Sequence, residues 1–262
     1  MPSDPNSKTR IWMAFLSLFA VFSAGAYFVA DLGKLQEDFS ARESRAALQG
    51  ITDPGQIEEV FRRYPSNKFL QMVAMATRAA DETSTAAERL SNEVEPPGVS
   101  RGINLGAASR ADLEALRRDL KIAQANAAAL LPRLGALLQT ERDNVKKYAL
   151  SLQIKNDTVT GLLDNIDKRH AEITAMTSRM SSARADFYRA YENYVAVLAA
   201  EFGTYKVVDG QFIFPFQRTV DRYNVAANAM TAAAKQVAEL KEQRKNLMKA
   251  GQDRWMQFVN GT

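Results

Sequence analysis

The stretch from Leu163 to Leu198 reads LDNIDKRHAEITAMTSRMSSARADFYRAYENYVAVL, and its apolar spacing determines the fold class that we predict. Five apolar or aromatic residues recur every seven positions: Ile166, Ile173, Met180, Phe187 and Tyr194. In a heptad count that starts at Leu163, eight of eleven core positions are apolar. A period near 3.5 residues is typical of long α-helices that pack at shallow angles. The sequence therefore predicts a mainly α-helical fold of the antiparallel bundle or coiled-coil type.

Two further runs have the same spacing, one on each side of this stretch. Residues 113–151 carry nine apolar residues at twelve core positions, with Glu141, Asn144 and Ser151 as the exceptions. Residues 223–258 carry eight at eleven. A helix of ~45 residues is about 65–70 Å long, so residues 109–262 are expected to form an elongated bundle of three long helices.

The ends of these helices carry local signals. Ser109 is expected to cap the first long helix, with Asp112 in a position like that of a capping box. Pro132 should kink this helix, because proline lacks the N–H of the helical hydrogen bond. Asn156-Asp157 is the predicted turn before the second helix. Leu247 is expected at a core position of the third.

The segment between the second and third helices, residues 205–215, predicts a β-hairpin. Its letters are YKVVDGQFIFP, in which β-branched and aromatic residues flank Asp209-Gly210. Asp-Gly between such residues is a strong signal for a two-residue turn. This is the only convincing strand signal in the sequence.

Residues 31–92 are expected to form helices close to a membrane, and residues 93–108 a linker. Asp53 and Pro54 open one helix that ends near Tyr64, and a second runs from Lys68 to about Asn92. The linker, EVEPPGVSRGINLGAA, contains Pro96-Pro97 and three Gly residues, which mark irregular backbone.

The apolar run at residues 11–30, IWMAFLSLFAVFSAGAYFVA, contains no charged residue and no Asn, Gln or His. Roughly 20 apolar residues are needed for a helix that crosses ~30 Å of hydrocarbon. Trp12 and Tyr27 lie near the two ends, where aromatic side chains favour the membrane interface. We therefore predict a single transmembrane anchor.

The flanking charges predict the orientation of this anchor. Lys8 and Arg10 precede it, while Asp31 follows it, and positive residues favour the cytoplasmic side. Residues 1–10 are thus expected to be a cytoplasmic tail. The large helical domain, residues 31–262, would then lie on the opposite side of the membrane.

A cleaved signal peptide is the alternative for the same segment. Ala24-Gly25-Ala26 resembles a small-residue cleavage site. The apolar run continues through Tyr27 to Ala30, however, which favours an anchor that is not removed.

Composition narrows the chemistry. The chain has no Cys and one His, which excludes thiol catalysis and zinc sites built from Cys. Its net charge of +4 is spread along the chain. The nearest basic cluster, from Lys241 to Arg254, reads as a solvated helix face, so no nucleic-acid partner is expected. No phosphate-binding loop, nucleophile elbow or dinucleotide fingerprint occurs. The sequence therefore predicts no enzyme and no cofactor.

Two polar residues occupy core positions of the heptad count. His170 lies between Ile166 and Ile173, where a hydrogen-bonded polar residue would fix helix register. Arg184 is expected to pair with Glu141 or with another carboxylate between helices. The alternative is that it marks a place where the bundle opens to solvent or to a partner. A role for His170 in sensing pH stays open, because imidazole titrates nearest to neutral pH.

The hairpin concentrates large apolar residues, namely Phe212, Ile213, Phe214 and Phe216. They have two readings. The hairpin either caps the bundle, or it projects a hydrophobic tip that docks a partner, because exposed apolar patches are often interfaces.

The stretch GQFIFPFQRTVDRYN, from Gly210 to Asn224, resembles the corresponding part of a family of uncharacterised helical envelope lipoproteins of bacteria. The shared features are a Gly, an aromatic–Pro pair, and Tyr-Asn about eight positions later. The resemblance implies a bacterial envelope setting, in which the predicted anchor would lie in the inner membrane and the helical domain in the periplasm. It also implies a helical bundle with a hairpin, and it implies no activity. This chain departs from the family in its predicted anchor and in having no Cys to lipidate.

These features predict a non-enzymatic, membrane-anchored envelope protein that acts as a scaffold, spacer or assembly factor of a larger complex. Its partner would be another protein or a second copy of the chain. The alternative is a ligand-binding or sensory ectodomain that relays to a partner membrane protein.

Overall fold

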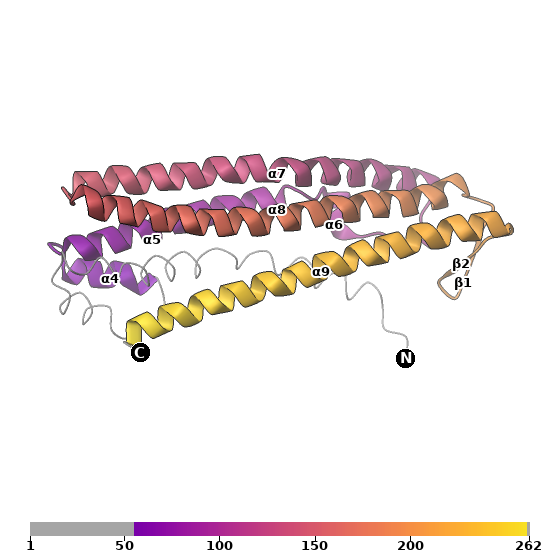
Figure 1. Ribbon diagram of the computed structural model, residues 1–262. Coiled ribbons are helices and arrows are strands. Elements are labelled where there is room, and N and C mark those ends of the chain that lie inside the picture. The colour runs from indigo at the N-terminus through magenta and orange to yellow at the C-terminus, as the bar shows by residue number, and fades with distance from the viewer. Residues whose placement is uncertain (1–54, 261–262) are drawn as a thin grey trace. The chain divides into compact units, whose positions relative to one another are not determined.

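The computed structural model describes residues 55–260, and its secondary structure is almost entirely helical (Figure 1). Its elements are α4 (Gly55–Arg63), α5 (Lys68–Asn92), α6 (Pro97–Arg101), α7 (Arg110–Ser151), α8 (Asn156–Ala200), β1 (Lys206–Val208), β2 (Gln211–Ile213) and α9 (Gln217–Asn260). The two strands form one antiparallel sheet. The prediction of a mainly α-helical fold with one short hairpin is confirmed.

The described chain divides into two compact units. Unit 1 comprises residues 91–131 and 177–242, and unit 2 comprises residues 55–90, 132–176 and 243–260. Helices α7, α8 and α9 each contribute a segment to both units. Each unit has its own group of buried apolar side chains.

The core of unit 1 lies between α7 and α8, with α9 and the hairpin packed against it. The buried residues of α7 in this unit follow the predicted heptad positions: Leu113, Leu116, Leu120, Ala123 and Ala127. On the α8 side, Tyr194, Val195 and Leu198 are buried. Tyr223 and Met230 of α9 are half-buried against the same cluster.

The core of unit 2 lies between α5, α7 and α8. Leu70 and Met72 of α5 are almost completely buried, as are Val145 of α7 and Ile166 of α8. Phe61 of the short helix α4 packs against this group. Large apolar side chains removed from water stabilise such a core by about 1.5–3 kcal/mol each.

Helices α7 and α8 are joined by four residues and lie antiparallel, side by side in each unit (Figure 1). Two ion pairs between α7 and α8 are consistent with a single register of the two helices. In unit 1, Arg117 Nε lies 2.9 Å from Glu192 Oε1, and in unit 2, Arg142 Nε lies 2.6 Å from Asp167 Oδ1. Moving from the first pair to the second takes equal steps forward along α7 and backward along α8.

The predicted start of α7 is confirmed. The backbone N–H and the hydroxyl of Ser109 both donate to Asp112 Oδ2, at 2.9 and 2.7 Å. The backbone N–H of Asp112 donates back to Ser109 Oγ at 3.2 Å. These reciprocal bonds satisfy donors that the first helical turn leaves unpaired.

The predicted heptad frame fails in the second half of α7. The helix continues through Pro132, and its buried positions become Leu134, Leu138, Glu141, Val145 and Ala149. The predicted core positions Asn144 and Ser151 are exposed instead. A straight α-helix has 3.6 residues per turn and drifts away from a strict 3.5-residue count, which explains this change of frame.

The turn between α7 and α8 lies earlier than predicted, at residues 152–155, and Asn156 is already helical. The chain reverses through Gln153, which has a positive φ of 54°. The sequence prediction chose Asn156-Asp157 because such residues favour turns. Gln has no such preference, so its role in the turn could not be read from the sequence.

The predicted linker is not irregular throughout, because α6 lies within it. Pro97 occupies its first turn, where the missing N–H of proline does no harm. A Cβ added at Gly98 would lie 1.9 Å from Oδ2 of Asp119 in α7. Glycine thus permits α6 to approach α7 closely.

The predicted hairpin is confirmed in place and in turn type. Lys206 pairs with Ile213, Val207 with Phe212, and Val208 with Gln211. Asp209 and Gly210 have positive φ angles of 50° and 77°, as a type I′ turn requires.

Two further predictions concern α9 and the anchor. Leu247 is 50% exposed, so its predicted core position is wrong. The predicted anchor, with Trp12 and Tyr27, and the predicted caps Asp53 and Pro54 lie outside the described residues. From residue 55 to residue 260, no helix combines the length and apolarity that crossing a membrane would require.

Candidate functional site

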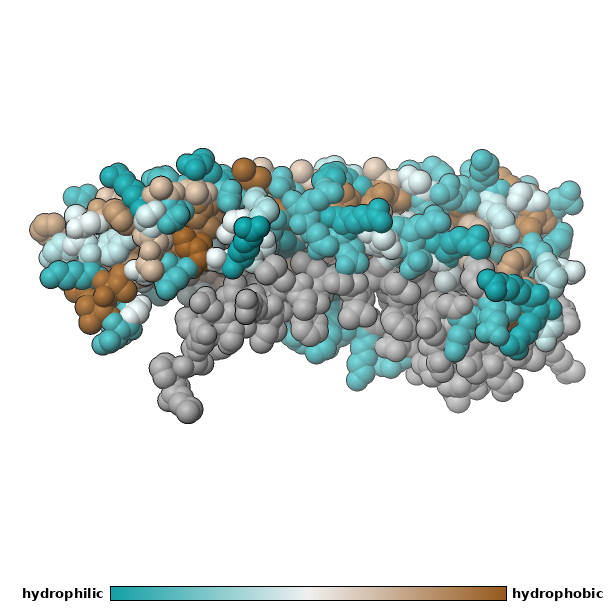
Figure 2. Space-filling model, turned by 180° about the vertical axis from the view of Figure 1, so that it is seen from behind, coloured by the Kyte–Doolittle hydropathy of each residue, from teal (hydrophilic) through white to brown (hydrophobic). Residues whose placement is uncertain are grey.

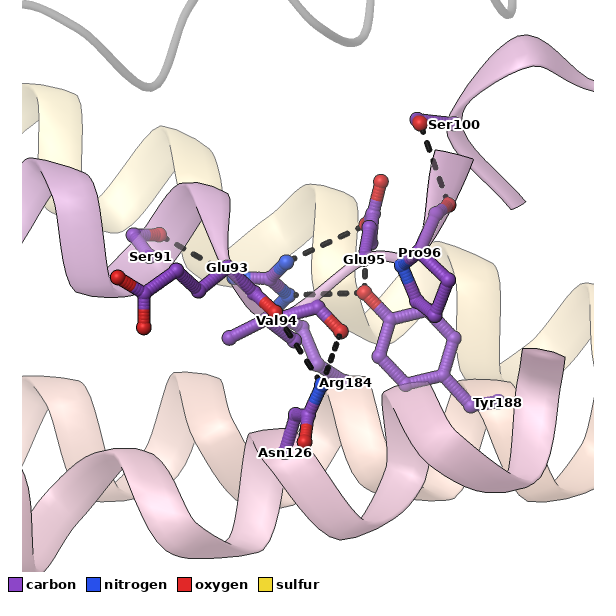
Figure 3. A network of polar contacts seen from close by, with 9 residues as sticks. All are labelled: Ser91, Glu93, Val94, Glu95, Pro96, Ser100, Asn126, Arg184 and Tyr188. Carbon is purple, nitrogen blue, oxygen red and sulfur yellow. Dashed lines mark hydrogen bonds and ion pairs between the residues drawn. The ribbon is translucent and has the colours of Figure 1, made fainter. Parts of the chain in front are cut away.

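The first candidate site is a group of polar side chains in unit 1, here called the Arg184 cluster: Ser91, Glu95, Arg184 and Tyr188. Arg184 is 7% exposed and Tyr188 is 1% exposed. Figure 3 shows the guanidinium of Arg184 pointing toward Glu95 and Ser91, with the hydroxyl of Tyr188 at the same carboxylate. The cluster therefore joins α8 to the segment between α5 and α6.

Each of the three nitrogen atoms of the Arg184 guanidinium donates a hydrogen bond in this cluster. Nη2 donates to Glu95 Oε1 at 3.2 Å, Nη1 to Ser91 Oγ at 3.3 Å, and Nε to Tyr188 Oη at 3.1 Å. Tyr188 Oη in turn donates to Glu95 Oε1 at 2.5 Å. A buried arginine is tolerated when its charge is paired and its donors are bonded in this way.

The backbone of the same segment is bound by α7. The side-chain amide of Asn126 donates to the carbonyl oxygens of Glu93 and Val94, at 3.2 and 3.4 Å (Figure 3). The segment 91–96 thus accepts hydrogen bonds from both α7 and α8. Burial raises the pKa of Tyr188 far above its ordinary value, so the tyrosine remains a neutral donor at any physiological pH.

The second candidate site is the Glu141 cluster of unit 2, made of Glu141, Arg169 and His170. The side chain of Glu141 is 2% exposed and that of Arg169 is 7% exposed. Arg169 donates from Nη2 to Glu141 Oε1. His170 Nε2 lies 3.6 Å from the same oxygen, beyond an ordinary hydrogen bond.

The charge of Glu141 is held by its neighbours. Burial acts to raise the pKa of the carboxyl, but His170, Arg169 and the hydroxyl of Thr83 outweigh it and lower the pKa below its ordinary value. At the rim, Arg142 lowers the pKa of Asp167 through their hydrogen bond. Glu141 is therefore an ionised carboxylate at neutral pH, paired with Arg169 within the core.

These two clusters bear on two predictions from the sequence. Arg184 was expected to pair with Glu141 or with another carboxylate, and its partner is Glu95. Glu141 pairs with Arg169. His170 is buried, at 9% exposure, as its heptad position predicts. That His170 and Arg184 fix helix register stays a prediction.

The third candidate is the hairpin, where the four predicted docking residues separate into two pairs. Phe214 is buried and Phe212 is half-buried, and both belong to the core cluster of unit 1. The rings of Phe214 and Tyr223 lie 5.0 Å apart, and those of Phe212 and Tyr205 lie 5.2 Å apart. These two phenylalanines cap the core and leave little apolar surface for a partner.

Ile213 and Phe216, in contrast, face solvent. They are 51% and 65% exposed, and Val208 on the adjacent strand is 52% exposed. Figure 2 shows hydrophobic surface gathered at the end of unit 1 that carries the hairpin (left in that view). Phe212 and Phe214 therefore cover the end of the core. Of the four residues, only Ile213 and Phe216 remain candidates for docking a partner.

A metal centre finds no support in the described part of the chain. No group of three or more His, Asp or Glu side chains between residues 55 and 260 is arranged to hold a metal ion. The buried arginines pair instead with carboxylates, Arg169 with Glu141 of α7 and Arg184 with Glu95 of the segment after α5. Chemically, the arrangement suits the fastening of segments to each other.

Sequence reasoning missed Ser91, Glu95, Tyr188 and Arg169. The heptad count assumes that only two positions in seven are buried. Several elements pack around α8, so this helix also buries adjacent pairs such as Arg169 and His170. A count that also admitted the residue beside each core position would have found Tyr188 and Arg169. Ser91 and Glu95 carry no such signal, because Ser91 lies at the end of α5 and Glu95 lies in the segment that follows.

The likeness of residues 210–224 to envelope lipoproteins stays a prediction. The sequence and the structure were compared with protein-family models, with curated proteins and with solved structures, and none of these comparisons gave a match.

Proposed function

We propose that this chain is a non-enzymatic protein of the bacterial envelope, anchored in the inner membrane by residues 11–30, that serves as a scaffold, spacer or assembly factor of a larger complex. The charges around the anchor support a position of residues 31–262 on the side of the membrane away from the cytoplasm. In this role, the helical units hold partner proteins in fixed positions.

One observation supports the proposal most directly: two buried arginines, Arg184 and Arg169, pair with carboxylates of other segments. Arg184 joins α8 to residues 91–95, and Glu141 joins α7 to Arg169 of α8. Such contacts contribute little net stability, but they penalise every other register, because a shifted helix would leave a buried charge unpaired. A protein that positions other proteins needs helices that are held in a single register.

The length of the helices supports the same proposal. Helices α7, α8 and α9 contain 42, 45 and 44 residues, so each is on the order of 65 Å long. Two of them keep one register through ion pairs in both units. Long helices in a defined register provide extended surface for several partners.

The test is affinity purification of the full chain from native membranes, after mild cross-linking, with a tag at Thr262. The proposal expects at least one protein in stoichiometric amount, identified by mass spectrometry. The comparison variant is Arg184→Leu, which leaves Glu95 without its cation and loosens residues 91–96. Partner recovery should fall at least several-fold, while helix content by circular dichroism is kept.

A matched control is Arg189→Leu, one and a half turns further along α8. Among the described residues, Arg189 pairs only with Asp186 on its own helix, and its side chain is 64% exposed. Its replacement should leave recovery unchanged. Native membranes that yield no stoichiometric partner contradict the scaffold function. A small molecule that raises the melting temperature of the same preparation would then favour the sensory alternative.

A further inference from the structure

We propose that helix α7 contains a bending joint at residues 127–132, about which unit 1 and unit 2 change their mutual orientation. The inference goes beyond the scaffold function, and neither depends on the other. It starts from the place where α7 passes from one unit to the other, between Leu131 and Pro132. Pro132 lies in the interior of this helix of 42 residues. A proline at such a position removes one helical hydrogen bond, and its ring clashes with the carbonyl group four residues earlier.

Two successive carbonyl groups of α7 depart from the regular helical pattern at this joint. The carbonyl oxygen of Ala128 would accept from the N–H of residue 132, and Pro132 has no N–H to donate. The carbonyl oxygen of Ala127 accepts a hydrogen bond from the hydroxyl of Ser181 in α8, within unit 1. Helices bend sharply at prolines and where a side chain inserts into the row of backbone hydrogen bonds. Both causes of bending therefore act on adjacent carbonyl groups of α7.

The apolar cores of the two units are separate along α7. The core cluster of unit 1 extends along this helix to Leu130, and that of unit 2 begins at Val145. Leu134 and Leu138, which are buried between them, belong to neither cluster of described residues. Because a close-packed core resists deformation, each unit is expected to move as one body. Bending of α7 therefore costs least between the two clusters, where Pro132 lies.

The other two long helices are built in a way that permits this bending. Helix α8 changes unit after Met176, in the middle of the stretch TAMTSRMSS (residues 174–182), which contains five Ser or Thr residues. Such hydroxyls compete for backbone hydrogen bonds and often bend helices. Helix α9 changes unit after Glu242, and beyond Leu240 none of its described side chains is buried. Neither helix therefore has the packing or composition that would hold α7 straight.

The absence of Cys from the sequence permits a direct test. The double substitution Arg118→Cys/Lys147→Cys places two spin labels at exposed positions of α7, one in each unit. The two positions are 29 residues apart, which is close to eight helical turns, so in a straight helix they share one face at a distance of about 44 Å. Double electron–electron resonance measures the distribution of this distance in the full chain, reconstituted into lipid nanodiscs.

The expected result is a broad distribution that Pro132→Ala narrows by roughly twofold, because alanine restores the missing N–H and removes the clash of the proline ring. The matched control is Gly135→Ala, which adds a methyl group that meets nothing within 4 Å. This substitution supplies no missing hydrogen bond and should leave the width unchanged. A second label pair, Ala111→Cys/Ala125→Cys, lies on α7 within unit 1. Its distribution should be narrow with or without Pro132.

Equal widths with and without Pro132→Ala overturn the proposal, as does equal narrowing by Pro132→Ala and Gly135→Ala. A broad distribution for the label pair within unit 1 also overturns it, because the motion would then lie inside that unit. Failure of the scaffold function has a different signature, since the distance measurement requires no partner. In that case, the narrowing by Pro132→Ala persists while affinity purification returns no partner.

Discussion

At the scale of single residues, Tyr188 shows how far the Arg184 cluster depends on one hydroxyl. Tyr188→Phe removes the group that donates to Glu95 and accepts from Arg184, while it keeps the buried ring. We expect the free energy of unfolding to fall by about 1–3 kcal/mol, because the buried Arg184 and the partly buried Glu95 each lose a hydrogen-bond partner. Thermal unfolding followed by circular dichroism measures this change.

The control for Tyr188 lies one turn away on the same helix. Tyr191 has no hydrogen bond to another described residue, and it packs against Phe187 at 5.9 Å between ring centroids. Tyr191→Phe should therefore change stability by less than about 0.5 kcal/mol. Equal effects of the two substitutions would show that the hydroxyl of Tyr188 contributes nothing specific.

Glu141 gives a second prediction at this scale. Glu141→Gln leaves the guanidinium of Arg169 in the core without a counter-charge, and breaking a buried ion pair costs about 3–5 kcal/mol. The melting temperature should fall markedly. Asp143→Asn, at an exposed position of the same helix, should leave it almost unchanged.

The lowered pKa of Glu141 also predicts how stability depends on pH. A carboxyl whose pKa is lower in the folded state than in the unfolded chain stabilises the fold above the unfolded value, here 4.5. This contribution is lost as the pH falls below 4.5 and through the folded value. Melting temperatures between pH 7 and pH 3 should fall more steeply for the wild type than for Glu141→Gln. Parallel curves would contradict the prediction.

At the scale of elements, glycine has opposite roles in the hairpin and in α7. Gly210 has a φ of 77°, which an L-residue adopts only at a cost, so Gly210→Ala should destabilise the hairpin by about 1–2 kcal/mol. Gly135 is exposed within α7, and an added Cβ would meet nothing within 4 Å. Gly135→Ala should therefore stabilise the protein by about 0.5–1 kcal/mol.

Near-ultraviolet circular dichroism distinguishes these two substitutions. The rings of Tyr205, Phe212 and Tyr223 pack together only when the hairpin is formed. Gly210→Ala should thus weaken the aromatic signal, and Gly135→Ala should leave it intact while it raises the melting temperature. A shift of the same sign for both would mean that backbone conformation is not the deciding factor.

The elements also show what the sequence could and could not reveal. Ser109, Asp112 and Asp209-Gly210 act through local backbone chemistry, so their roles could be predicted from neighbouring residues alone. The turn at Gln153 and the helix α6 arise from tertiary packing, which local preferences do not record. For the same reason, burial of His170 and Arg184 could be predicted from periodicity, whereas the identity of Glu95 as a partner could not.

At the scale of the whole molecule, the proposed anchor predicts how the chain fractionates. Residues 11–30 supply the 20 apolar residues that a spanning helix needs. The full chain should remain with membranes after alkaline carbonate extraction, and a chain without residues 1–30 should be released into the soluble fraction. An immunoblot of the two fractions decides the matter, and a full chain that is released would contradict the anchor.

The division of the chain into units has a consequence for its synthesis. Unit 1 is interrupted by residues 132–176, so Glu95 meets Arg184 only after the ribosome has added 89 more residues. At roughly 5–20 residues per second, that interval lasts about 4–18 s. During this time the apolar stripe from Leu113 to Ala127 has no partner helix. The newborn chain therefore needs protection from aggregation before α8 is complete, and no single cut can release either unit whole.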